Sequence, residues 1–216
     1  MDSAEPDRGD LTARARIRDA AMAHFGEHGF DGATIRGIAE TAGVSSGLVR
    51  HHFGSKQGLR DACDAHLAKV LRRLNDRVLA DRTPEDVNYV AAARAAVGPY
   101  QGYLARALTE GGAAPLFDEM VELGRQRLVD TDRERSDPPD VDPKVRAAVG
   151  TAMALSITVL HEHVSRAMGV DVFSPEGDEL LARALIDIHS HPQLSLEDAA
   201  AARAALDHLR QTRPTR

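Results

Sequence analysis

Side chains able to bind a nucleic acid gather between residues 45 and 56, in the segment SSGLVRHHFGSK. Four of them are related by steps of three and four residues: Ser46, Gly47, Arg50 and His51. On a helix this spacing forms one outward face, small at its start and cationic further along. Small residues let a backbone approach a groove closely, and Arg50 can donate to a phosphate or to a guanine edge. The face is typical of a helix that reads DNA, and an ordinary helical hairpin with exposed basic residues is the alternative.

Two short helices around a glycine turn are predicted to position this face. Thr34 is placed to cap the first helix, and Gly43 ends it because glycine tolerates the positive φ of helix ends. Ser45 can cap the second helix, in which Val49 and Phe53 lie four residues apart and face inward. The spacing predicts a helix-turn-helix, preceded by a helix from about residue 12 to residue 28.

The phrases AAMAHFGEHGFDGATI and IAETAGVSSGLVRHHFGSK, followed by Leu59, resemble the N-terminal DNA-binding domain of the TetR family of bacterial transcriptional regulators. The resemblance covers about the first quarter of the chain. It departs from the family at Arg50, where tyrosine is usual, and at His52, where an aromatic residue is usual. The pattern and the resemblance together assign DNA binding to Thr34, Ile35, Arg36, Ser45, Ser46, Gly47, Arg50, His51, His52 and Lys56.

Lys56 stands in the first turn of a long helix that Ser55 can cap. Backbone N–H groups at a helix start favour an anion, so a cation there is locally unfavourable and points to a phosphate partner. A solvated surface lysine is the alternative. Arg50 can replace a phosphate-binding tyrosine and adds charge, whereas His52 leaves the contact at its position open.

The composition describes an acidic chain with a mildly basic head. The 216 residues carry a formal net charge of −6, yet residues 10–60 hold seven Lys or Arg against five acids. This distribution suits a DNA reader whose remaining part stays away from DNA. The single cysteine excludes an internal disulfide, and the N-terminus lacks the features of a secretion signal. The longest nearly apolar stretch, residues 147–160, is short for a membrane span, so a soluble cytoplasmic protein without a membrane partner is expected.

Every strong signal after the helix-turn-helix is helical, and no alternating run indicates a strand. Start and stop residues predict helices from 56 past 78, and at about 84–97, 99–109, 114–132, 143–168, 175–190 and 196–212. The expected fold is all-α, with three helices in the head and six or seven in the body. The expected parts are a disordered tail over residues 1–10, a helix-turn-helix DNA-binding domain over 11–58 and a larger helical domain over 59–216.

Signals for catalysis or for a bound metal are weak. The sequence has no Ser-His-Asp order, no HExxH motif and no pair of cysteines. His24 and His28 lie one helical turn apart, a spacing that can hold a metal, but no third ligand is evident nearby. A histidine near the negative end of a helix is explained by the dipole. The chain is therefore expected not to be an enzyme and to use no cofactor or metal.

A helical body behind a helix-turn-helix can sense a ligand, pair with a second subunit, or do both. The resemblance implies both: a small-molecule cavity among the middle helices and a homodimer formed through the last long helices. The predicted helix 143–168 lacks a polar stripe over residues 147–160, as a helix covered on two sides should, although a central helix of a monomer would look similar. The candidate ligand-binding residues are Tyr89, Tyr100, Tyr103, Phe117, Met120, Met153 and His161. Each of them, taken singly, also suits a core position.

These patterns favour a dimeric regulator that binds double-stranded DNA at an inverted-repeat operator. The resemblance further implies a repressor that a small-molecule inducer releases. The residues alone do not distinguish a repressor from an activator, and they do not identify the ligand. A helical ligand-binding or interaction module without a role in DNA regulation is the alternative.

Overall fold

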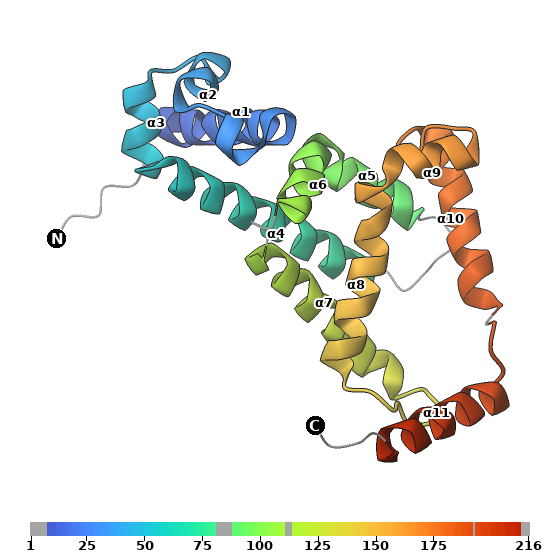
Figure 1. The fold of residues 1–216 in the computed structure, drawn as a ribbon. Helices are drawn as coiled ribbons and strands as arrows, with labels where there is room; N and C mark the ends of the chain where they lie inside the picture. The colour runs from blue at the N-terminus through green and yellow to red at the C-terminus, as the bar shows by residue number, and fades with distance from the viewer. Residues whose placement is uncertain (1–7, 81–87, 111–113, 192, 213–216) are drawn as a thin grey trace.

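The computed structural model describes residues 8–80, 88–110, 114–191 and 193–212. All regular elements within these ranges are helices, which confirms the predicted all-α class. Figure 1 shows the first three helices as a head at one end of the long helix α4 (Lys56–Ala80), with the other helices grouped beyond it. None of the helices in the described ranges is long and apolar enough to cross a bilayer.

Three helices form the head: α1 (Arg8–Gly32), α2 (Ile35–Ala42) and α3 (Ser46–Phe53). Their boundaries follow the predicted caps. The Thr34 hydroxyl accepts a hydrogen bond from the Gly37 N–H at 3.0 Å, which caps α2. The Ser45 hydroxyl accepts from the Leu48 N–H at 3.1 Å, which caps α3. Between these caps Gly43 takes a left-handed conformation with φ 65°, as the turn requires.

The core of the head continues into the body. Ile17 of α1, Ile38 of α2 and Val49 of α3 are fully buried, as their spacing predicts. α4 (Lys56–Ala80) adds Leu59 to this cluster, and Leu104 of α6 (Gln101–Thr109) belongs to the same cluster. The packing therefore runs across residue 58 without a break, and the proposed domain boundary there remains a prediction.

Cys63, the only cysteine of the sequence, is fully buried in this core. Its Sγ donates a weak hydrogen bond to the Arg18 carbonyl oxygen at 3.7 Å. Burial raises the pKa of the thiol, and the nearby Asp64 carboxyl raises it further. Cys63 is therefore a packing residue with little thiolate character.

The body contains seven α-helices and one short 3-10 helix within the described ranges. They are α5 (Tyr89–Val97), η2 (Gly98–Tyr100), α6 (Gln101–Thr109), α7 (Ala114–Asp132), α8 (Pro143–Val159), α9 (His161–Met168), α10 (Pro175–Ser190) and α11 (Leu196–Gln211). α7 and α8 pack along each other, α4 lies against α5 and α7, and α6 lies between α1 and α8. α6 and α4 are thus the two helices that connect the head with the body.

The start of α5 differs from the prediction. The expected start at Thr83-Pro84 lies outside the described residues, but Asn88 has extended backbone angles, with φ −80° and ψ 99°. Its side-chain oxygen accepts from the Val90 N–H at 3.0 Å, so Asn88 caps a helix that begins one residue later. The helix that ends at Val97 therefore starts at Tyr89 rather than near residue 84.

The predicted single helix over residues 143–168 is also wrong. It is divided at Leu160, where φ −100° and ψ 18° leave the helical range, and α8 and α9 meet at an angle (Figure 1). The His161 ring nitrogen Nδ1 lies 3.0 Å from the Thr158 carbonyl oxygen. In the tautomer with a proton on Nδ1, the ring donates to an oxygen that a continuous helix would offer to the N–H of residue 162. A side chain thus competes with the backbone ladder at this point.

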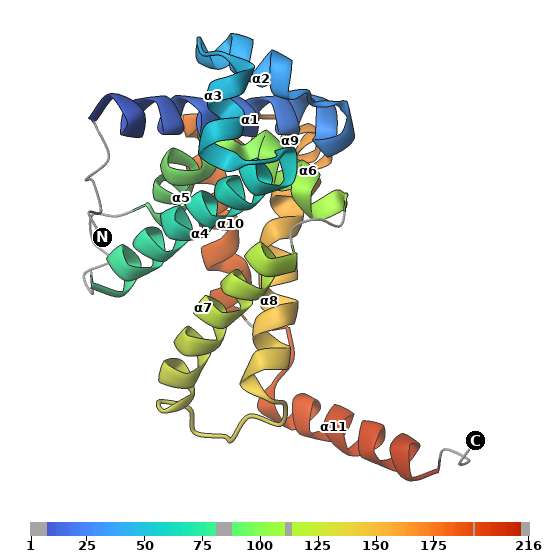
Figure 2. The same cartoon turned by 90° about the vertical axis from the view of Figure 1, so that its left-hand side faces the viewer.

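Exposed large apolar side chains of the described chain lie only between residues 141 and 209. On α8, Val145, Val149 and Met153 follow one another at four-residue steps and are 54%, 57% and 65% exposed. We call these three residues the α8 apolar stripe. Ile186 and Ile188 of α10 are similarly exposed, and Figure 2 shows α11 extending away from the ends of α7 and α8. Apolar surface concentrated in this way indicates an interaction site.

Candidate functional site

The outward face of α3 is present as predicted. Gly47, Arg50 and His51 are exposed and Ser46 is half-buried, whereas Val49 on the opposite side is buried. A Cβ added to Gly47 would have only the Ser45 hydroxyl near it, at 3.7 Å, so the glycine is not required by internal packing. Its lack of a side chain instead leaves the start of α3 open to a close neighbour.

The last turn of α3 is held by α1. Arg14 donates to the His52 carbonyl oxygen at 3.1 Å, and its guanidinium carbon lies 4.8 Å from the centroid of the Phe53 ring. His52 itself is half-buried beside this contact. Arg14 thus fixes the orientation of α3 and places a further positive charge near the recognition face. Sequence reasoning missed Arg14, because its partner lies 38 residues away.

The residues assigned to DNA binding at the start of α2 have different environments. Arg36 is exposed and pairs with Glu40 at 2.9 Å, one turn further along the helix. Thr34 is exposed, but its hydroxyl already caps α2. Ile35 is partly buried against the core of the head. The structure places nine of the ten assigned residues in the head and the tenth, Lys56, at the start of α4, and their contacts with DNA remain predictions.

Lys56 has a structural partner that the sequence did not reveal. Its ammonium donates to the Ala33 carbonyl oxygen at 3.0 Å and to the Asp31 carbonyl oxygen at 3.3 Å. It also lies 4.6 Å from the centroid of the Phe30 ring. Lys56 therefore ties the start of α4 to the connection between α1 and α2, and two of its three N–H groups are engaged within the chain.

Of the two histidines at positions 24 and 28, His24 has a partner within the chain. His24 Nε2 lies 2.7 Å from the Thr41 hydroxyl, so this side chain bridges α1 and α2. No group of three or more metal-binding side chains occurs anywhere in the described ranges.

α1 and α6 approach each other closely at two glycines. A Cβ added to Gly26 would lie 2.7 Å from the Tyr103 backbone nitrogen and 2.9 Å from the Gly102 carbonyl carbon. Real Cβ atoms do not come this close to backbone, so any side chain at Gly26 must push the two helices apart. The absence of side chains here allows the head to sit directly on α6.

Polar contacts from α6 hold the end of α1 beside these glycines. The Arg106 guanidinium donates to the Glu27 carbonyl oxygen at 3.2 Å. The Glu110 carboxylate accepts from the Phe30 N–H at 3.3 Å. Between these two contacts Gly29, with φ 73°, ends the regular part of α1, as predicted. We call these contacts and the paired glycines the α1–α6 junction.

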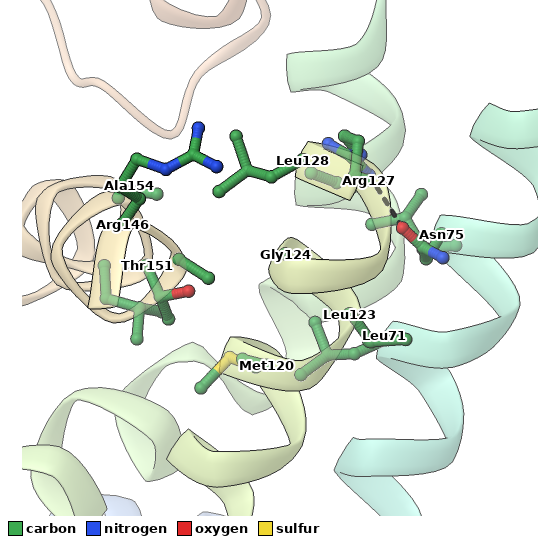
Figure 3. A pocket seen from close by; sticks show the side chains of 15 residues that line it. Leu71, Asn75, Met120, Leu123, Gly124, Arg127, Leu128, Arg146, Thr151 and Ala154 are labelled. Atoms are coloured by element: carbon green, nitrogen blue, oxygen red, sulfur yellow. Dashed lines mark hydrogen bonds between the residues drawn. The ribbon is translucent and has the colours of Figure 1, made fainter. Parts of the chain in front are cut away.

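A cavity of about 630 Å³ lies between α4, α7 and α8 (Figure 3). Its apolar lining includes Leu71, Leu74, Met120, Leu123, Leu128 and Leu155. A volume of this size and a mostly apolar wall suit a small organic molecule. The cavity borders α4, the helix whose first turn supports α3. A molecule bound in the cavity would therefore contact the helix that leads to the recognition face.

Four polar residues also line the cavity: Asn75, Arg127, Arg146 and Thr151. Figure 3 shows Asn75 and Arg127 joined by a hydrogen bond on one side and Arg146 on the α8 side. The bond runs from Arg127 Nη2 to the Asn75 side-chain oxygen at 2.7 Å. Sequence reasoning missed both arginines, because charged residues on helix surfaces are common and only the fold shows which of them border a cavity.

The predicted ligand-binding residues are distributed over several environments. Met120 lines the 630 Å³ cavity, and Phe117 lines a second hollow of about 320 Å³ together with Leu160. Met153 is exposed in the α8 apolar stripe, and His161 stacks near Phe173 with ring centroids 5.3 Å apart. The side chain of Tyr89 lies outside the described part of the structure.

The other two tyrosines pair with α4. Tyr100 lies with its hydroxyl 3.2 Å from His66 Nε2. Tyr103 is buried against Phe25 of α1, and its hydroxyl donates to the Asp64 carboxylate. Neither tyrosine lines the 630 Å³ cavity, so their role in ligand binding remains a prediction, and their contacts are those of core residues.

Replacing Tyr103 with phenylalanine should destabilise the head. Burial raises the pKa of the Asp64 carboxyl, and the Tyr103 hydroxyl partly opposes this by donating to the carboxylate. Without the hydroxyl the half-buried carboxylate loses its donor, which should cost about 1–3 kcal/mol of unfolding free energy near pH 7, measured by urea denaturation.

The loss of unfolding free energy in Tyr103→Phe should become smaller as the pH falls. A carboxyl whose pKa is raised by folding binds more protons folded than unfolded, so it favours folding more as the pH falls. The variant should raise the pKa of Asp64 further, so the stability difference from the wild type should shrink on acidification. A difference that grows on acidification would contradict the assigned hydrogen bond.

A left-handed glycine turn between two capped helices, with the second helix presenting small and cationic residues outward, defines a helix-turn-helix DNA-binding protein. Residues 17–63 match the family described as bacterial regulatory proteins, tetR family, so the head is a DNA-binding domain of the TetR type. This match confirms the resemblance found in the sequence and covers α1 from Ile17 onward, α2, α3 and the beginning of α4.

Similar proteins extend the likeness beyond the head. The chain is 42% identical over 140 residues to the HTH-type transcriptional regulatory protein RaaS of Mycobacterium tuberculosis, covering 64% of this chain and 66% of RaaS. The aligned part thus spans about two thirds of that relative. A solved gamma-butyrolactone receptor (ArpA-like protein) is 27% identical with a TM-score of 0.55, covering 71% of this chain and 82% of the receptor. The fatty acid degradation regulator FadR from Bacillus halodurans has a TM-score of 0.62 at 16% identity, covers 84% of this chain and 96% of FadR, and shows likeness of fold alone.

Proposed function

We propose that this protein is a dimeric transcriptional repressor that binds an inverted-repeat operator and is released by a small-molecule inducer. The observation that carries the proposal is the connection of an exposed recognition face on α3, through α4, to an apolar cavity of about 630 Å³. Cytoplasmic location, where operator DNA is found, belongs to the same proposal. The names of RaaS, a transcriptional regulatory protein, and of the gamma-butyrolactone receptor support regulation and ligand response respectively.

A two-fold dimer is supported by the exposed apolar surface. One recognition helix covers only a few base pairs, so useful specificity needs two of them, and a two-fold pair needs an inverted repeat. The α8 apolar stripe and the exposed isoleucines of α10 provide a surface that a second copy can cover. Catalysis has no place in this proposal, because its parts are a recognition face, a cavity and a pairing surface.

The proposed switch uses two routes from the cavity to the head. α4 lines the cavity with Leu71 and Asn75 and begins at Lys56, which is tied to the α1–α2 connection. α6 packs on α8 and is hydrogen-bonded to α1 at the α1–α6 junction. A ligand that fits one arrangement of α4, α7 and α8 better than another shifts the population of head positions. Ligand and DNA affinities must then be reciprocally coupled, typically by about 1–3 kcal/mol.

Gel shifts with the DNA upstream of the protein's own gene test the proposal directly. Arg50→Ala should weaken binding to cognate and random DNA by similar factors and reduce the slope of log affinity against log salt by about one unit. If Arg50 reads a guanine instead, its loss should relax preference at one base position by about 1–3 kcal/mol. Unchanged affinity would remove Arg50 from the interface.

Lys56→Ala is the matched comparison, because the Lys56 ammonium already donates to the Asp31 and Ala33 carbonyl oxygens. Its loss should lower the melting temperature of the protein and change the salt slope less than Arg50→Ala does. A folded chain that binds none of the DNA would favour the alternative function, a helical ligand-binding or interaction module. Equal salt effects from both variants would instead restore Lys56 as a phosphate contact.

A further inference from the structure

The 630 Å³ cavity is chemically uneven. Most of its wall is aliphatic, but two arginines of different helices, Arg127 of α7 and Arg146 of α8, border it. An apolar compound alone would gain nothing from guanidinium groups at the wall, because their N–H groups would meet no acceptor on it. The state of each arginine therefore decides what the cavity can hold.

Arg146 is already neutralised by the chain. Its Nη1 donates to Asp132 Oδ1 at 3.0 Å, and its Nη2 donates to the other carboxylate oxygen of Asp132. Its Nε donates to the Val141 carbonyl oxygen at 2.9 Å. Accordingly the Arg146 guanidinium lowers the pKa of the Asp132 carboxyl. Three of its N–H groups donate within the chain, and its charge is paired with the Asp132 carboxylate. Arg146 therefore joins α8 to the end of α7 and has little capacity left for a ligand.

Arg127 is held but not neutralised. Its partner is the side-chain oxygen of Asn75, a neutral acceptor on α4 that is only 7% exposed. Among the described residues no carboxylate forms an ion pair with Arg127. The buried amide fixes the guanidinium at the cavity wall, and the guanidinium stays accessible from solvent, so an entering head group can reach its remaining donors.

We propose that the ligand of this cavity is an aliphatic molecule with one anionic head group, a carboxylate or a phosphate, which Arg127 binds while the leucines of α4 and α7 cover its tail. The inference rests on the proposed function, since it names the class of inducer. A planar guanidinium suits either anion because it donates two parallel hydrogen bonds. Arg127 of α7 is hydrogen-bonded to Asn75 of α4. A ligand bound to Arg127 is therefore connected to the helix that leads to the head.

Isothermal titration calorimetry on the full chain with two matched pairs of probes tests the head group. The pairs are decanoate with methyl decanoate and decyl phosphate with 1-decanol, so each arm compares an anion with a neutral molecule of similar tail. In at least one pair the anion should bind about tenfold or more tightly than its neutral partner, and Arg127→Gln should abolish this preference. The pair that shows the preference identifies carboxylate or phosphate as the head.

Arg125→Gln is the control, because Arg125 lies on the same helix, pairs with Glu122 at 2.7 Å and does not line the cavity. It should keep the full preference, and Arg127→Lys should keep part of it. If Arg127→Gln does not fold, Asn75→Asp supplies the guanidinium with an internal carboxylate and should remove the preference in the same way. Equal binding of anion and neutral partner in both pairs, no binding by any probe, or a preference that survives neutralisation of Arg127 would overturn the inference.

Gel shifts without probe separate this inference from the proposed function. A chain that prefers the anion but binds no DNA would refute the repressor and leave the ligand class intact. A chain that binds DNA but shows no preference for anions would refute the ligand class and leave the repressor.

Discussion

Val149→Asp should yield a folded monomer whose affinity for a two-half-site operator is lower by about 10²–10⁴-fold. Val149 stands in the middle of the α8 apolar stripe and is 57% exposed, so a carboxylate there does not disturb the interior of one chain. In the proposed dimer the same carboxylate would be buried against apolar surface, which is strongly unfavourable. Sedimentation velocity measures the loss of the dimer, and a gel shift measures the loss of affinity.

Ala95→Asp is the matched control, since Ala95 is an exposed residue of α5 outside the stripe and gains the same charge. It should stay dimeric. Binding of the Val149 variant to a single half-site should remain close to that of the wild type, because each head is intact. If the Val149 variant sediments as the wild type does, the second subunit does not cover the α8 stripe.

Gly26→Ala should lower the unfolding free energy by about 1–3 kcal/mol, although alanine normally stabilises a helix relative to glycine by up to about 1 kcal/mol. The expected change in unfolding free energy thus has the opposite sign to the intrinsic helix preference for alanine. The new Cβ would lie 2.7 Å from the backbone nitrogen of Tyr103, and a backbone atom cannot rotate away as a side chain can. The α1–α6 junction must open, so the operator affinity should also respond less to an inducer.

Gly47→Ala provides the opposite result in the same head. Its Cβ has only an ordinary contact at 3.7 Å, so stability should be unchanged or slightly higher. Its DNA affinity should nevertheless fall, because the methyl group occupies the surface where α3 approaches the groove. Denaturation curves and gel shifts on both variants distinguish a residue needed for packing from one needed for DNA. Equal stability of the two variants would show that α1 and α6 tolerate separation at Gly26.

The head was predictable because its signals are local. Thr34, Gly43 and Ser45 act within three residues of themselves, through caps and a left-handed turn, and the structure places each as expected. The inward positions Val49 and Phe53 follow from helical spacing alone. Such features depend on sequence neighbours, so a single sequence contains them in full.

The features that sequence reasoning missed depend on contacts between distant residues. The helix position of Lys56 predicts a phosphate contact, which remains a prediction, but it does not reveal the internal partners Asp31 and Ala33. The scarcity of tyrosines singles out Tyr103 as a candidate ligand contact, but it does not reveal that the Tyr103 hydroxyl donates to Asp64 on another helix. The cavity wall escaped notice for the same reason, since Asn75 and Arg127 are 52 residues apart and neither stands out in its own helix.

The burial of Cys63 has a consequence for the conditions to which the protein can respond. Oxidants, electrophiles and thiol-reactive metals attack a thiolate that solvent can reach, and here the only thiol is enclosed in the core and kept protonated. We expect a thiol-specific alkylating reagent to leave operator binding unchanged in the folded protein. A regulator with an exposed, low-pKa thiol would change state under the same treatment, whereas the buried Cys63 gives this chain no thiol-based response.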